Sequence, residues 1–97
     1  MSKPFRFGVQ SFNAESAEDW AEQVQRAEAL NYSAFHLADH IIGSGPALEK
    51  ANHPEQNLAA IPAMAYAAAV TSKINIGCRV FCVDYHLPIV LIKSAMT

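Results

Sequence analysis

The sharpest chemical feature of the sequence is the pair Asp39-His40, a carboxylic acid followed directly by an imidazole. A histidine donates or accepts a proton near neutral pH, and a carboxylate beside it can raise its pKa or fix its tautomer. In an extended strand neighbouring side chains point to opposite faces, so the two groups need not pair with each other. Two interpretations therefore stay open: a proton-transfer site, or a loop anchor at Asp39 with His40 packed beside it.

Three further features carry weaker signals. His36 and His40 have the spacing of metal ligands only on a helix, and on a strand they lie too far apart to share one ion, so no metal site is predicted. Arg79 interrupts an apolar run, where it either needs an anionic partner or reaches solvent near a strand end. Cys78 and Cys82 lie in an expected strand, which would separate them by about 13 Å and prevent a disulfide. Packing is the favoured interpretation for both thiols.

The elements that must position these groups alternate between strand and helix patterns. Residues 5–12 carry apolar side chains in alternation, and a capping box at Ser16 opens a helical pattern that runs to about Leu30. Residues 34–38 form a short apolar run of the kind that a parallel sheet buries. Residues 41–61 are rich in glycine, proline and asparagine, and this long connection predicts a loop at the active site.

The second half of the chain repeats the alternation. Pro62 opens an alanine-rich helix through Ser72, residues 74–83 form a third strand, and Pro88 opens a third helical pattern over residues 89–97. This order predicts an α/β fold of parallel βαβαβα units. A (β/α)8 barrel of about 250 residues spends about 31 on each unit, so the chain corresponds to the first three units of a truncated TIM-like barrel. A dinucleotide-binding half is disfavoured because no glycine-rich turn follows the first strand.

Composition limits the function classes. The chain has 97 residues, of which 52% are hydrophobic and 16% charged, and a formal net charge of −2. These values predict a single partial domain over residues 1–97 and exclude a disordered tail or a basic nucleic-acid-binding surface. The sequence has no apolar run near the roughly 18 residues of a membrane span. It also has neither the pattern of a signal peptide nor a framework of paired cysteines, so we expect a cytoplasmic protein.

Five segments, taken in order and with their spacing, carry a family resemblance. They are residues 5–10 (FRFGVQ), residues 17–32, Ala38-Asp39-His40, residues 67–77, and His86-Leu87-Pro88 followed by Lys93. Together they resemble the N-terminal part of the bacterial-luciferase-like oxidoreductases. The sequence of residues 78–84 (CRVFCVD) resembles the enzymes that use the deazaflavin coenzyme F420 more than those that use FMN.

The resemblance implies a flavin- or deazaflavin-dependent oxidoreductase or monooxygenase that acts on a small-molecule substrate and holds the cofactor ring at the barrel mouth. It places Asp39 and His40 beside the ring as catalytic and cofactor-binding residues, with His40 as proton donor or substrate-orienting group. It also maps a cofactor-binding bulge behind the ring, often built on a non-proline cis peptide, onto Arg79-Val80. The later loops that hold the cofactor's phosphate-bearing tail lie outside residues 1–97. We therefore expect these residues alone to bind F420 or FMN weakly and to be catalytically incomplete.

The alternative is a non-catalytic remnant that self-associates or binds a partner through its open sheet. Right-handed crossovers place all three helices on one face of the sheet. Large apolar side chains on the other face would then stay in water, each at a loss of about 1.5–3 kcal/mol. Both outer strands would also present unpaired edges. We therefore expect a homo-oligomer rather than a compact monomer.

Overall fold

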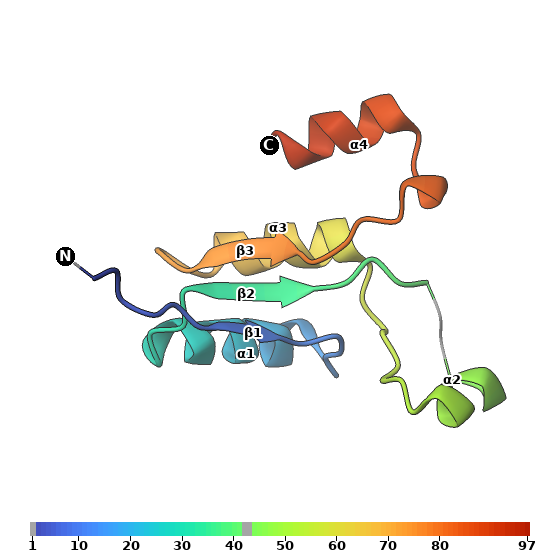
Figure 1. The fold of residues 1–97 in the computed structure, drawn as a ribbon, viewed down its shortest axis with the longest axis horizontal. Coiled ribbons are helices and arrows are strands. Elements are labelled where there is room, and N and C mark those ends of the chain that lie inside the picture. The colour runs from blue at the N-terminus through green and yellow to red at the C-terminus, as the bar shows by residue number, and fades with distance from the viewer. Residues whose placement is uncertain (1, 42–43) are drawn as a thin grey trace.

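Three parallel strands form one open sheet in the computed structural model, which describes residues 2–41 and 44–97 (Figure 1). The strands are β1 (Gly8–Gln10), β2 (Ala34–Leu37) and β3 (Asn75–Cys78). Each strand pairs with the next one along the sequence, so that Phe35 in the central strand lies opposite Val9 on one side and Ile76 on the other. The predicted α/β class and consecutive βαβαβ order are confirmed, and the sheet is not closed.

Two helices lie side by side behind this sheet (Figure 1). The first, α1 (Ala17–Ala29), begins at the predicted cap, where Ser16 Oγ accepts a backbone N–H of the first turn at 3.0 Å. It is followed by Asn31 in the left-handed conformation, with φ 64°. The second, α3 (Ala60–Ala69), begins two residues before the predicted Pro62, because proline is tolerated within the first turn of a helix.

The hydrophobic core lies between the sheet and these two helices. The Trp20 ring meets Phe35 edge-on, with centroids 5.2 Å apart, and its indole N–H donates to the carbonyl of Ala63 at 2.9 Å. This bond satisfies the one polar group of a side chain that is otherwise buried. The remaining core residues are Val24, Ala27, Leu37, Ala60, Ala67 and Ile74. The core therefore fixes β2, and with it the residues that follow β2.

The edge strands are shorter than the sequence pattern predicts. The pattern spans residues 5–12 and 74–83, whereas β1 and β3 have three and four residues. Each edge strand has a single neighbour, and the apolar side chain of Phe5 has no layer to cover it, so it is 91% exposed. Cys82 lies beyond the end of β3, so the prediction that both cysteines share one strand is wrong. Both are free thiols.

The local structure differs from the sequence pattern or from the family resemblance at two further places. The connection over residues 41–61 contains a short helix, α2 (Pro46–Ala51), because proline suits the first turn of a helix and good helix formers follow it. The peptide bond between Arg79 and Val80 is trans, since the described residues contain no cis peptide. The trans chain continues the parallel pairing with β2, in which the Arg79 N–H donates to the carbonyl of Leu37 at 2.9 Å.

The uncovered face of the sheet is polar and small, not apolar as the sequence analysis predicts. Side chains alternate along a strand, and the large ones, such as Phe35 and Leu37, point into the helix-covered core. The strand positions left for the other face are Gly8, Gln10, Ala34, His36, Asn75 and Gly77. Exposing this face to water therefore costs the folded chain little free energy.

Exposed apolar side chains gather instead at the C-terminal helix. A short 3-10 turn (Val83–Tyr85) carries the chain away from β3 into α4 (Pro88–Ala95), which buries no residue. Figure 1 shows α4 set apart from α1 and α3, so the prediction that all three helices cover one face is wrong. Ile89 is 73% exposed and Ile92 55% exposed.

This exposed surface of α4 leads us to expect that the chain forms dimers or larger assemblies at micromolar concentration, as measured by sedimentation velocity. Replacing Ile89 and Ile92 together by glutamate should restore a monomer, because an unpaired charge is costly to bury in an interface. Asn75→Glu places one negative charge on the open sheet face instead and should leave association unchanged. A wild-type monomer, or a double variant that associates like the wild type, would contradict the expectation.

Glu28 joins the end of α1 to the turn before β3. Its Oε2 accepts the backbone N–H groups of Lys73 at 2.8 Å, Ile74 at 3.0 Å and Ser72 at 2.9 Å. These bonds, the one from Lys73 first, hold the pKa of the Glu28 carboxyl below its ordinary value of 4.5. The stabilisation is therefore present above that value and is lost as the pH falls through the lowered pKa of the folded state.

Glu28→Gln keeps one oxygen acceptor but removes the charge, so we expect a lower Tm at neutral pH and a shallower loss of Tm below pH 4.5. Thermal unfolding followed by circular dichroism across this range measures both effects. Glu22→Gln, an exposed position on the same helix, removes the same charge and serves as the control. If Glu28→Gln and the wild type lose Tm in parallel on acidification, Glu28 is not the group responsible.

Candidate functional site

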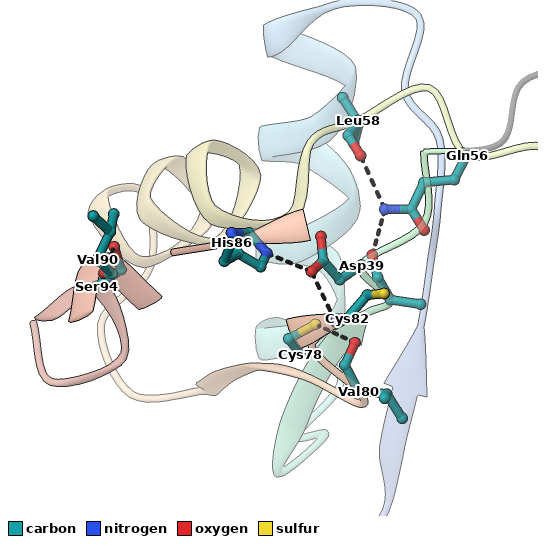
Figure 2. Close-up of polar contacts among 10 residues, drawn as sticks. Asp39, Gln56, Leu58, Cys78, Val80, Cys82, His86, Val90 and Ser94 are labelled. Atoms are coloured by element: carbon teal, nitrogen blue, oxygen red, sulfur yellow. Dashed lines mark hydrogen bonds and ion pairs between the residues drawn. The ribbon is translucent and has the colours of Figure 1, made fainter. Parts of the chain in front are cut away.

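Asp39 directly follows β2 and is the buried carboxylate of the site, with 7% of its surface exposed. Its Oδ2 accepts the backbone N–H of Cys82 at 3.0 Å and lies 2.7 Å from Nε2 of His86 (Figure 2). A carboxylate only accepts hydrogen bonds, so His86 Nε2 carries the shared hydrogen. The Asp39 backbone N–H also donates to the carbonyl of Val80 at 3.3 Å. Asp39 thus fastens the residues after β3 to the end of β2.

His86 is held on two sides. Asp39 binds its Nε2, and Phe81 meets its ring edge-on with centroids 6.2 Å apart. The sequence analysis missed His86 as a site residue, because 47 positions separate it from Asp39 and no spacing rule joins two such positions. The available signal was an imidazole just before the helical pattern that became α4, at the same end of the sheet as Asp39.

The predicted pair Asp39-His40 divides into two different environments. While Asp39 bonds to Cys82 and His86, Nδ1 of His40 is buried and has no hydrogen-bond partner among the described residues. Such an atom costs about 1–3 kcal/mol. Buried polar atoms without partners are rare in folded proteins and require an explanation such as a catalytic role. Asp39 is therefore an anchor in this structure, while His40 keeps unused hydrogen-bonding capacity.

A second imidazole, from the long connection after β2, covers His40. The ring centroids of His40 and His53 lie 5.1 Å apart, and those of Phe12 and His53 lie 6.3 Å apart. His53 Nδ1 lies 2.8 Å from the carbonyl oxygen of Pro54 and must donate to it, since a carbonyl only accepts. This bond fixes the tautomer and orientation of His53 next to His40.

Gln56 ties the same connection to the end of β2. Its side chain is 6% exposed and its Nε2 donates to the carbonyl oxygens of Ala38 and Leu58 (Figure 2). Its Oε1 is buried without a partner among the described residues. Gln56 therefore fixes the end of the connection that leads into α3, while α2 projects away from the sheet and most of its residues are exposed (Figure 1).

Arg79 and Val80, the predicted cofactor-binding bulge, follow β3 at the same edge of the sheet. The Arg79 side chain is exposed, and its Nη1 donates to the amide Oε1 of Gln10 at 2.9 Å. Of the two interpretations of this arginine, the structure shows the one that reaches solvent. The Val80 side chain is 68% exposed, while its carbonyl is held by the Asp39 N–H.

The thiol of Cys78 lies close to the Asp39 carboxylate (Figure 2). Burial raises the pKa of this thiol, and the charge of Asp39 raises it further. Its Sγ donates to the carbonyl of Val80 at 3.2 Å. Because the thiolate is the nucleophilic form, a raised pKa makes Cys78 unreactive at neutral pH. These observations favour the packing role over a catalytic one.

The part of the chain that the structure describes, residues 2–41 and 44–97, also bears on metal and membrane sites. No group of three or more His, Cys, Asp or Glu side chains in this part of the chain is arranged to hold a metal ion. Nor does any helix of this part have the length and apolar character needed to cross a membrane.

Comparison with known proteins gives one match. The family model described as luciferase-like monooxygenase matches residues 1–97. Neither a curated protein nor a solved structure matches the chain. The family match spans every element of the fold and both halves of the Asp39-His40 pair.

The bond between His86 and Asp39 generates a stability prediction. His86→Phe keeps a flat ring against Phe81 but removes the donor to a buried carboxylate, so we expect the free energy of unfolding to fall by about 1.5–3 kcal/mol. His86→Gln restores an N–H donor and should recover part of this loss. Urea denaturation measures the energies, and hydrogen exchange at the Cys82 amide reports local opening. Equal stability of wild type and His86→Phe would show that the bond contributes nothing.

Proposed function

Because the chain belongs to the luciferase-like monooxygenase family, we propose that it serves in an oxidoreductase that uses coenzyme F420, with FMN as the alternative cofactor. The observation that supports the site is the buried, unpartnered Nδ1 of His40 at the C-terminal ends of the strands. In α/β folds ligands bind at that end. The family match supports the oxidoreductase class and does not favour the non-catalytic alternative.

The residues at this edge fit a flat ring with polar edges. Val80 presents an exposed apolar side chain, and the bond between its carbonyl and the Asp39 N–H keeps it next to the end of β2. His40 follows Asp39 directly and supplies a polar atom without a partner. Apolar walls with a few placed polar groups are typical of cofactor pockets. We therefore assign Arg79 and Val80 to the wall behind the ring, and Asp39 and His40 to its edge.

In this proposal the cofactor, when bound, transfers a hydride to or from a small-molecule substrate. His40 then donates or accepts, at a ring nitrogen, the proton that accompanies the hydride. Asp39 is already engaged by Cys82 and His86, so it acts as a positioning residue that holds the wall in place. His53 limits the orientation of His40 by covering its ring.

The proton-transfer role predicts a large kinetic effect. In a chain extended to the complete barrel, His40→Ala should lower kcat by about 10²–10⁴-fold while changing cofactor affinity much less. His40→Gln can hydrogen-bond but cannot carry a proton, so it should be equally slow. Steady-state kinetics gives kcat, and fluorescence titration with F420 and with FMN gives both affinities. Unchanged turnover in His40→Ala, or full activity in His40→Gln, would remove His40 from proton transfer.

A further inference from the structure

The open face of the sheet carries a cation whose chemistry the proposed reaction does not use. Arg79 reaches from the end of β3 to Gln10 at the end of β1, and these two strands flank β2. Neighbouring strands are about 4.8 Å apart, so the side chain must cross the face of β2 to make this contact. The guanidinium therefore lies over the C-terminal end of the central strand, β2.

The guanidinium keeps most of its binding capacity. It has five N–H groups in a planar fork, and the contact with Gln10 uses Nη1. The one ion pair among the described residues joins His86 to Asp39, so no carboxylate of this part of the chain neutralises Arg79. A neutral amide thus orients the guanidinium without cancelling its charge. The edge formed by Nε and Nη2 has the geometry that binds a carboxylate or phosphate through two parallel hydrogen bonds.

The floor beneath this cation is built to accept a polar group. Gln10, His36 and Gly77 lie opposite one another in the strand register. The His36 ring lies across two glycines: a Cβ would fall 3.1 Å from the ring at Gly77 and 3.4 Å from it at Gly8. The absence of side chains at these positions lets the imidazole lie along the sheet, which leaves room above it. His36 is a second possible hydrogen-bond donor beside Arg79.

We propose that Arg79, Gln10 and His36 form a recognition site for an oxyanion, a carboxylate or a phosphate group, on the open sheet face at the barrel mouth. Arg79 supplies the charge and the paired donors, Gln10 fixes the guanidinium, and His36 lines the floor. A ligand of this site must therefore carry a carboxylate or a phosphate group. It requires no redox chemistry, and its test is independent of the proposed reaction.

The test is an NMR titration of the chain with sodium acetate and, separately, with sodium phosphate. Chloride holds the ionic strength constant, because screening alone moves charged groups. We expect saturable shifts of the Arg79 Nε–Hε signal, with a Kd on the order of 1 mM for the preferred anion, and no shift with neutral acetamide. Tighter acetate binding identifies a carboxylate ligand, and tighter phosphate binding identifies a phosphorylated one. The formal net charge of −2 makes general anion attraction by the whole surface weak.

Variants separate this site from surface charge in general. Arg79→Gln should abolish the saturable response of the nearby His36 ring signals, and Arg79→Lys should weaken binding about tenfold because the paired donors are lost. Arg26→Gln removes an equal charge from the exposed last turn of α1 and should bind like the wild type.

Gln10→Glu is a further test variant, and it keeps Arg79 in place. It places a carboxylate against the guanidinium, so the site is filled from within and anion binding should disappear while the Arg79 signal stays observable. The proposal is overturned if neither anion gives saturable shifts in the wild type. It is equally overturned if the shifts persist in Arg79→Gln or in Gln10→Glu.

Discussion

The arrangement of the chain at the C-terminal ends of the strands depends on one buried carboxylate. Asp39 leaves the end of β2 with 7% of its surface exposed, and a carboxylate in such a place must be hydrogen-bonded. The two groups that satisfy Oδ2, the Cys82 N–H and the His86 ring, both come from the segment after β3. This requirement brings a segment more than forty positions away in sequence to the end of the central strand. It does so without extending the sheet, and α4 begins from the position that this contact sets.

The same constraint gives Asp39 and His40 different roles. Because Asp39 is used for anchoring, His40 is left without a carboxylate partner and is oriented by packing against His53. The helix-covered face of the sheet carries the stability of the domain through the contacts of Trp20 and Phe35. The other face, with Arg79 above His36, carries polar chemistry. In this architecture the hydrophobic core and the polar side chains occupy opposite faces of three short strands.

Local signals in the sequence were sufficient for the elements near the core. Ser16 caps α1 as its spacing indicates, and the apolar run around Phe35 is the central strand. The length of β1 was overestimated, because the alternation of apolar residues at Phe5 continues past the point where a neighbouring strand exists to pair with it. The bond between Asp39 and His86 could not be predicted, since it depends on how a turn of the chain is placed in space. The polar character of the open face was missed because large apolar side chains were expected on both faces, whereas those of Phe35 and Leu37 point into the helix-covered core.

We propose that the ring-binding edge lies where Asp39 joins the ends of β2 and β3. Amide chemical-shift mapping with lumiflavin, a flavin ring without a phosphate tail, tests this location in residues 1–97 directly. We expect the largest shifts to fall on residues 38–41 and 79–82 and to diminish in Asp39→Asn, which loosens the wall. Largest shifts on α1 or α4, or a response that Asp39→Asn leaves unchanged, would contradict it.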